Sequence, residues 1–318
     1  MSFISHYSDD WRLLTLKNIQ TRRLWGWGHS VQKFVSAGEP HPRESNHLLI
    51  ASDYGGDHAR STHHIYCYLV VRQIVPEWLS TIRAIRRSLL TNSRTMSYKR
   101  LDDPQRQEAL VPFLAAAADV DGHLVAIAVD KRKKWLSTVP GFADDLRQTL
   151  GLKASWNPRS LEAMMRKVHF TALLLSIWSR PYTNVTWITD EDEFVANDER
   201  HDDALQAAAR MSSFYFSHPM GVFQLNTTSQ DAETKDYEDF CAIPDLAAGM
   251  LSEISTRLAK EGAWEDRLRC VLDRSLPPKT DLIAKWFWDE DMRLRKTLVT
   301  IDVEGTRFGV RKVWMVAQ

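Results

Sequence analysis

The stretch His47–Val71 decides the fold, and it reads HLLIASDYGGDHARSTHHIYCYLVV. Two apolar runs, residues 47–54 and 63–71, lie on either side of a glycine-containing loop, which predicts two neighbouring β-strands. The first run ends in a carboxylate, Asp53, and a second carboxylate, Asp57, follows the glycines. Because a carboxylate is costly to remove from water, its place at the end of a buried strand calls for a specific partner.

Composition limits the classes of protein that fit this chain. It has 318 residues, 44% of them hydrophobic, which suits one elaborated domain or two smaller ones. Lys plus Arg equals Asp plus Glu at 41 each, so no long-range field draws the protein onto nucleic acid. Local basic runs, at residues 83–87, 130–135 and 293–296, remain candidates for such binding, although runs of this kind are usually solvated faces.

The cysteines and the apolar segments predict a soluble cytoplasmic protein. The three cysteines are far apart in the sequence and lack the spacing of a metal site, which favours a reducing compartment. The first residues do not have the pattern of a signal peptide. The longest apolar run, at residues 170–178, is too short to cross a bilayer, so we expect no membrane contact.

The pattern along the chain predicts an α/β fold, with a mixed sheet covered by helices. We divide the chain into a Trp/Arg-rich extension (residues 1–45), a main domain (46–262) and a C-terminal appendage (263–318) made of a helix and a β-hairpin that turns at Gly305. The first strands pair with sequence neighbours, and the later strands are separated by helices. Strands are also expected at residues 94–99, 123–131, 184–194 and 220–228, and helices at 76–90, 103–122, 159–179, 198–216 and from Pro244 to Gly262.

Acidic residues occur where apolar elements end or helices begin. Asp53 ends the first strand, Asp190 ends the strand VTWIT, and Asp245 opens the helix in PDLAAG. In an open α/β sheet, such positions converge on one crevice. Clustered carboxylates repel one another unless a cation lies between them, and oxygen ligands suit magnesium or manganese. Two such ions, about 3.5 to 4 Å apart, would activate water and stabilise the leaving oxygen in phosphodiester cleavage.

These motifs resemble the bacterial family known as domain of unknown function 3800, which belongs to the ribonuclease H-like superfamily. The resemblance covers residues 46–262 and rests on DYGGD (Asp53, Gly56, Asp57), WITDE (Asp190, Glu191) and PDLAAG (Asp245, Leu246, Gly249). It implies a ribonuclease H-like core and a mobile-element or phage-defence setting. It also implies that Mg²⁺ or Mn²⁺ is held by Asp53, Asp190 and Asp245, that Glu191 completes the shell, and that Lys99 contacts a phosphate or the attacking water.

The chain departs from the family pattern at two acidic positions. Tyr54 replaces the second acid of the first motif, and Ser97 stands where a glutamate usually precedes Lys99. Either the site has been reduced to a binding role, or other acids substitute for the missing ones. The candidate substitutes are Asp57, Asp130, Asp192 and Glu193.

Each candidate also has a purely structural interpretation. Asp53 would cap a glycine turn, Asp190–Glu193 would form a solvated loop, and Asp245 would stabilise the first turn of a helix through its dipole. Strand alternation places His63 and Cys67 on one face, where zinc binding competes with a simple buried histidine. His201 is a weak candidate for an acid or base.

The leading hypothesis is a metal-dependent nuclease, with RNA or DNA as its partner. Arg22, Arg23, Trp25 and Trp27 of the extension would contact the nucleic acid, because aromatic rings stack on bases. The alternative is a non-catalytic interaction module that binds a partner protein or nucleic acid. A nucleotide hydrolase or an effector activated by a partner is a third possibility, although no phosphate-binding loop of the GxxxxGK[ST] type is present.

Overall fold

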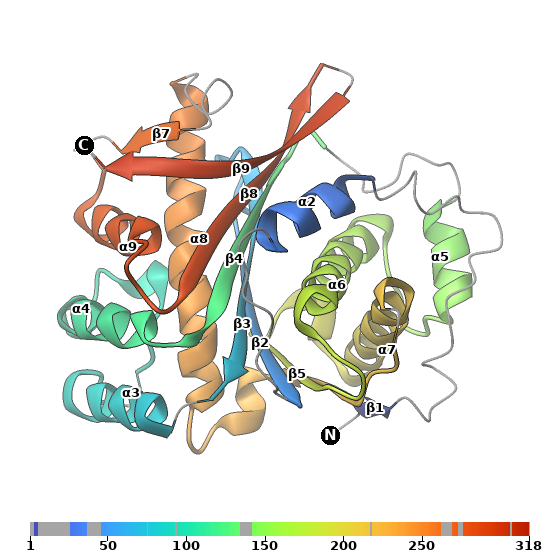
Figure 1. The fold of residues 1–318 in the computed structure, drawn as a ribbon, viewed down its shortest axis with the longest axis horizontal. Helices are drawn as coiled ribbons and strands as arrows, with labels where there is room; N and C mark the ends of the chain where they lie inside the picture. The colour runs from blue at the N-terminus through green and yellow to red at the C-terminus, as the bar shows by residue number, and fades with distance from the viewer. Residues whose placement is uncertain are drawn as a thin grey trace. The chain divides into compact units, whose positions relative to one another are not determined.

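The chain forms two compact units, here called unit 1 (residues 1–50 and 133–229) and unit 2 (residues 51–132 and 230–318). The computed structural model describes residues 3–5, 26–36, 46–74, 76–92, 94–133, 142–216, 218–261, 269–272, 276–305 and 307–317 (Figure 1). The chain first passes from unit 1 to unit 2 within strand β2 (His47–Gly55). This division differs from the predicted boundaries at residues 45 and 262.

Unit 1 combines a small group of strands with helices. Its strand order is β1-β6-β5-β2, in which β5 and β6 are parallel and β1 is antiparallel to β6. Helices α6 and α7 pack together, and α2 packs on α6, where Gln32 Nε2 donates to Ser176 Oγ at 3.0 Å. The elements are β1 (Phe3–Ser5), α2 (Gly26–Ser36), α5 (Phe142–Leu150), α6 (Pro158–Trp178), β5 (Asn184–Thr189), η3 (Glu193–Val195), α7 (Asp198–Tyr215) and β6 (Val222–Thr227), and η4 (Thr228–Asp231) leads back to unit 2.

Local sequence explains where the unit 1 helices begin. The side chain of Asn157 accepts from Ser160 N at 2.9 Å, and Pro158 occupies the first turn of α6, where its missing N–H costs nothing. Asn197 caps α7 in the same way, accepting from Arg200 N at 2.9 Å. Both helices therefore begin at the predicted positions.

Unit 2 is built on the strand order β2-β3-β4-β8-β9-β7. Strands β3 and β4 are antiparallel, β4 and β8 are parallel, and β8 and β9 form an antiparallel hairpin. Every residue of β4 is buried, and the long helix α8 packs against β3. The elements are β3 (His63–Gln73), α3 (Pro76–Leu89), η2 (Tyr98–Arg100), α4 (Pro104–Ala118), β4 (Asp121–Asp130), α8 (Asp236–Lys260), β7 (Arg269–Leu272), α9 (Pro278–Trp288), β8 (Arg295–Glu304) and β9 (Arg307–Ala317).

The predicted α/β fold with a mixed sheet and flanking helices is confirmed, while several local predictions are wrong. Residues 94–99 form no strand but lead into η2, because the Tyr98 N–H donates to the carboxylate of Asp245 instead of to a neighbouring strand. Helix α8 begins at Asp236, where three acids favour the helix dipole, so Pro244 lies inside the helix.

Two further differences concern the ends of elements in unit 2. Helix α4 ends at Ala118, and Gly122 already belongs to β4, where a Cβ atom would lie only 2.4 Å from the Val70 carbonyl oxygen. The hairpin around Gly305 is present, with a positive φ of 59° at the turn. Its strand β8 pairs with β4, so the hairpin extends the sheet. None of the described helices combines the length and the apolarity that a bilayer-spanning segment needs.

Candidate functional site

Two acids singled out in the sequence, Asp53 and Asp245, meet in unit 2 and are called the carboxylate pair. Asp53 lies near the end of β2, Asp245 lies in the first half of α8, and a hydrogen bond joins their side chains. The close approach depends on Gly55, because a Cβ atom there would come within 2.9 Å of the Ala248 carbonyl oxygen. A glycine after the strand thus permits the close approach of β2 to α8 beside the two carboxyl groups.

The segment before η2 completes the surroundings of Asp245. Tyr98 N donates to Asp245 Oδ2 at 2.7 Å, and the Ser97 side chain also hydrogen-bonds this carboxyl group. The positive charge of Lys99 acts on Asp245 as well. Asp245 thus has Tyr98 N and Ser97 as hydrogen-bond partners and Lys99 as a nearby positive charge, while the role of Lys99 toward a phosphate or the attacking water stays a prediction.

Tyr98 fixes this segment against α8. A Cβ atom on Gly249 would lie 2.1 Å from the Tyr98 ring, so only glycine permits this packing. The hydroxyl group of Tyr98 lies 3.0 Å from Thr280 Oγ1, and Lys279 Nζ lies 4.5 Å from the ring centroid. The Tyr98 side chain thus anchors the segment that carries Ser97 and Lys99 through contacts with Gly249, Thr280 and Lys279.

The carboxylate pair carries an electrostatic cost. Burial raises the pKa of Asp245, and the hydrogen bonds from Tyr98 N and Ser97 and the charge of Lys99 offset this shift only in part. Burial, followed by the charges of Asp53 and Asp245, raises the pKa of the fully buried Cys67 thiol. The thiol therefore lies within the field of both carboxylates, and burial favours its neutral form.

The position of the missing second acid is occupied by an aromatic side chain. Tyr54 has its hydroxyl group 2.8 Å from Ser52 Oγ, and its ring makes edge contacts with Tyr66 and Tyr68 at centroid distances of 5.9 and 6.1 Å. Tyr54 thus has structural contacts with its own strand and with β3. Neither Tyr54 nor Ser97 supplies a second negative charge to the carboxylate pair.

The acids of the motif WITDE, Asp190 and Glu191, lie in unit 1 just after β5. Asp190 is exposed, and its Oδ1 accepts from Glu191 N at 2.8 Å and from Thr228 Oγ1 at 3.0 Å. Asp192 forms an ion pair with Lys167. The structure therefore gives Asp190 and Asp192 local hydrogen-bonding roles within unit 1.

Other predicted site residues have different surroundings. Glu193 accepts from Ser160 Oγ at 2.7 Å and pairs with Arg200, and these contacts lower its pKa. His201 Nε2 lies 2.9 Å from the Leu225 carbonyl oxygen, which is a structural contact. Of the predicted nucleic-acid contacts, Arg22, Arg23, Trp25 and the side chain of Trp27 lie outside the described residues.

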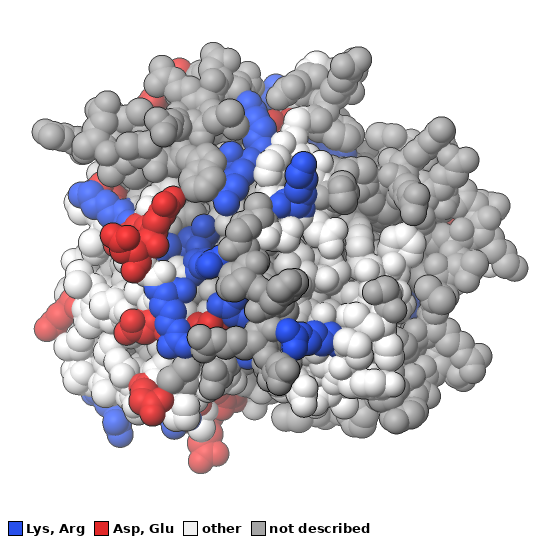
Figure 2. Space-filling model, in the orientation of Figure 1, with Lys and Arg blue, Asp and Glu red and all other residues white. Residues whose placement is uncertain are grey.

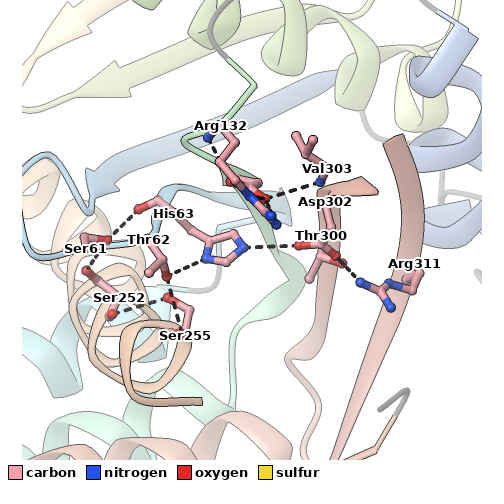
Figure 3. A network of polar contacts seen from close by, with 11 residues as sticks. Ser61, Thr62, His63, Arg132, Ser252, Ser255, Thr300, Asp302, Val303 and Arg311 are labelled. Carbon is pink, nitrogen blue, oxygen red and sulfur yellow. Dashed lines mark hydrogen bonds and ion pairs between the residues drawn. The ribbon is translucent and has the colours of Figure 1, made fainter. Parts of the chain in front are cut away.

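A second acidic site in unit 2 is formed by His63, Asp130 and Asp302, here called the His63 cluster (Figure 3). One ligand atom from each residue lies within 4.8 Å of the others, and the residues are 3%, 4% and 2% exposed. An imidazole and two carboxylates in this arrangement could hold a metal ion.

Each carboxylate of the His63 cluster is paired with an arginine. His63 Nε2 lies 3.1 Å from Asp302 Oδ1, while Asp302 Oδ2 accepts from Arg311 at 2.8 Å. Asp130 Oδ2 accepts from Arg132 Nε at 2.8 Å. Figure 3 shows the two arginines reaching the cluster from different sides. The negative charges are therefore compensated within unit 2.

Asp302 is not among the predicted site residues, because the sequence of its strand resembles that of any buried hairpin strand. The available signal was an acid inside the apolar run TLVTIDV, with Thr300 two residues before it on the same face. Thr300 Oγ1 indeed donates to Asp302 Oδ2 at 2.6 Å. His63 and Asp130 were considered separately, and nothing local connects either residue with Asp302.

Charged side chains of both signs share the face of the molecule drawn in Figure 2. Lys and Arg side chains gather over β8 and β9, with Asp and Glu nearby. The described basic residues of these strands include Arg295, Arg311 and Lys312. This local gathering of positive charge occurs in a chain of zero net charge.

Comparison with known proteins identifies no neighbour: no family model matches the chain, no curated protein is similar to it, and no solved structure matches it. The resemblance to the domain of unknown function 3800 family therefore stays a prediction from the motifs. The function must be argued from the two acidic sites themselves.

Proposed function

We propose that this protein is a metal-dependent phosphodiester hydrolase, and more particularly a nuclease with a ribonuclease H-like core. The observation that carries the proposal is the hydrogen-bonded contact between Asp53 and Asp245, with Lys99 acting on the same carboxyl group. A basic residue beside two carboxylates suits a phosphate group held near a cation.

The electrostatics of the carboxylate pair fit a divalent ion. Two partly buried carboxyl groups in contact favour a shared proton or cation, because two adjacent negative charges repel. Burial raises the pKa of Asp245, and the hydrogen bond with Asp53 is one of the contacts that offset this rise. Asp53 and Asp245 would hold Mg²⁺ or Mn²⁺ through their oxygen atoms. The ion would supply Lewis-acid activation of water.

The order of the strands supports a ribonuclease H-like core. Strand β2, which carries Asp53, is followed in the sheet order of unit 2 by β3 and β4, its successors in the chain. In unit 1, the neighbours of β2 are β5 and then the parallel strand β6. A central strand of this kind ending in a catalytic aspartate is what the proposal requires. Asp190 and Glu191 belong to unit 1 and are tested separately.

The test is cleavage of labelled single- and double-stranded RNA and DNA in the presence of Mg²⁺ or Mn²⁺. We expect Asp53→Asn and Asp245→Asn to lose roughly 100-fold or more in rate, since even an outer partner of a metal ligand contributes about 10–100-fold. Lys99→Ala should lose activity while keeping metal affinity. Asp144→Asn is the control, because Asp144 is an exposed acid that belongs to none of the three motifs.

Equal cleavage by wild type and by both carboxylate variants would contradict the proposed site. Asp190→Asn and Glu191→Gln, assayed in parallel, measure whether the unit 1 acids contribute to the rate. Variants of Arg22, Arg23, Trp25 and Trp27 should weaken nucleic-acid binding without changing metal affinity.

A second candidate, a non-catalytic interaction module, is favoured by the contacts of Tyr54. The position expected to hold an acid instead carries a ring that packs on Tyr66 and Tyr68. Such a module would retain nucleic acid or a partner protein without cleaving it. Retention of labelled RNA or DNA by wild type, with no metal-dependent product, would select this function over the nuclease.

A further inference from the structure

We propose that the His63 cluster is a resident site for a divalent transition-metal ion, separate from the carboxylate pair. The sheet itself brings the ligands together. His63 of β3 is paired with Asp130 of β4 in the antiparallel register. Val129 is paired with Ile301 in the parallel register of β4 and β8, so Asp130 and Asp302 are the next residues along these strands. Three adjacent strands thus present one ligand each.

Hydrogen bonds around His63 aim Nε2 into the cluster. Thr62 Oγ1 lies 2.9 Å from His63 Nδ1 and also donates to the Ser255 carbonyl oxygen at 3.5 Å. Since Thr62 has one hydroxyl proton, it accepts from Nδ1–H when it donates to Ser255. The Nε2 lone pair of the neutral ring then faces Asp302 Oδ1, 3.1 Å away.

This separation suits two ligands of one ion. Ligand atoms that each lie about 2.0–2.2 Å from a shared metal are themselves about 3 Å apart. In this tautomer, and without a cation, the Nε2 lone pair of His63 would face a carboxylate oxygen. A metal ion between Nε2 and Oδ1 removes this opposition.

The ligand side chains also have the outer hydrogen bonds that are usual around a metal ion. A ligating histidine usually donates its second N–H to an outer partner, and ligating carboxylates are hydrogen-bonded in turn. Thr62 serves His63 in this way, Thr300 and Arg311 hold Asp302 Oδ2, and Val303 N donates to Asp130 Oδ2 at 3.2 Å. Outside contacts therefore orient each ligand, and Figure 3 shows those of His63 and Asp302.

The donor set selects the class of metal. One imidazole nitrogen with two carboxylate oxygens suits Zn²⁺, Mn²⁺, Fe²⁺ or Co²⁺ better than Mg²⁺ or Ca²⁺, which prefer oxygen alone. The guanidinium of Arg132 competes for Asp130, but this side chain is 57% exposed. Its charge can move into solvent when a metal ion takes its place on Asp130.

The experiment uses the full chain with the carboxylate pair removed, Asp53→Asn/Asp245→Asn, so that only the second site is measured. Titration with Co²⁺, followed by its visible absorption, should show one equivalent bound. Adding His63→Gln or Asp302→Asn should weaken binding at least ~10-fold. Thr62→Val should also weaken it ~10-fold by releasing the ring, while Thr62→Ser should retain wild-type affinity.

No Co²⁺ binding by the double variant, or binding unchanged by both His63→Gln and Asp302→Asn, would overturn the proposal. If a ligand variant fails to fold, judged by circular dichroism, the Thr62→Val and Thr62→Ser pair decides the outcome, because neither change removes a buried charge. Cleavage is not measured here, so failure of this site is distinguishable from failure of the proposed nuclease function.

Discussion

The two acidic sites of unit 2 differ in the groups that compensate their carboxylates. In the His63 cluster, Asp130 and Asp302 are each bound by an arginine, at 2.8 Å from Arg132 Nε and from Arg311. In the carboxylate pair, Asp53 and Asp245 are bound to each other, and burial raises the pKa of Asp245. In the first site arginines compensate the negative charges, whereas in the second the hydrogen bonds and the charge of Lys99 offset the burial of Asp245 only in part.

This difference separates an arrangement that stabilises the fold from one that costs stability. Breaking a buried, compensated pair leaves an unpaired charge, so the native arrangement is needed for folding. Buried carboxylates in contact destabilise the protein, and such sites are retained where function needs them. The comparison therefore predicts opposite changes in the free energy of unfolding when a carboxylate is removed from each of the two sites.

The strongest test compares Asp302→Asn with Asp245→Asn in urea unfolding at neutral pH with a chelator present. Asp302→Asn should lower the free energy of unfolding by about 3–5 kcal/mol, because Arg311 loses its buried partner. Asp245→Asn should be neutral or stabilising by about 1 kcal/mol, since it removes a desolvated charge. Equal destabilisation by both variants would break the comparison.

A second prediction concerns the packing that holds Ser97 and Lys99 at the carboxylate pair. Gly249→Ala would place a methyl group 2.1 Å from the Tyr98 ring and should cost about 1–3 kcal/mol of unfolding free energy. It should also reduce cleavage by displacing Lys99. Gly28→Ala in α2 is the control, because its Cβ would have ordinary contacts of 3.5–3.6 Å. A stable, fully active Gly249→Ala protein would show that this packing is dispensable.

Asp239 combines features of both sites: it is buried and forms an ion pair with an arginine, yet its pKa is raised. Arg86 lies 3.0 Å away, but burial raises the pKa of Asp239 to about 7. A carboxyl group that binds its proton more tightly when folded loses stability as pH rises from its ordinary pKa of 3.8 through about 7.

The measurement is urea unfolding of wild type and Asp239→Asn across this window. Between about pH 5 and about pH 8, wild type should lose on the order of 1–3 kcal/mol more than the variant, given 1.36 kcal/mol per pKa unit. Parallel curves for the two proteins would mean that one arginine suffices to compensate a buried carboxylate here.

The smallest effect is expected at the exposed end of the loop that carries the first motif. Asp57 Oδ1 lies 3.1 Å from His64 Nδ1, but the Asp57 side chain is 81% exposed. Asp57→Asn should change the free energy of unfolding by less than about 0.5 kcal/mol, as for most surface pairs. A larger loss in urea unfolding would show that acids of this loop contribute to the fold beyond the carboxylate pair.

Much of the carboxylate pair could be predicted from local sequence. Asp53 follows a buried strand and a glycine comes after it, and this pattern alone indicated a special carboxylate. Asp245 was selected for the wrong local reason, as an acid in the first turn of a helix, whereas α8 begins at Asp236. The motif PDLAAG still marked the right residue, because Ala248 and Gly249 provide the small surfaces on which β2 and Tyr98 pack.

The sequence by itself determined the α/β class, most strands and helices, and the acids of the carboxylate pair, because hydrophobic periodicity and glycine positions act over a few residues. Only the tertiary structure decided which charges are compensated. His63 and Asp302 are 239 residues apart, and their contact depends on the parallel register of β4 and β8. No local pattern encodes the register of strands so distant in the chain, since it is set by the packing of the whole unit.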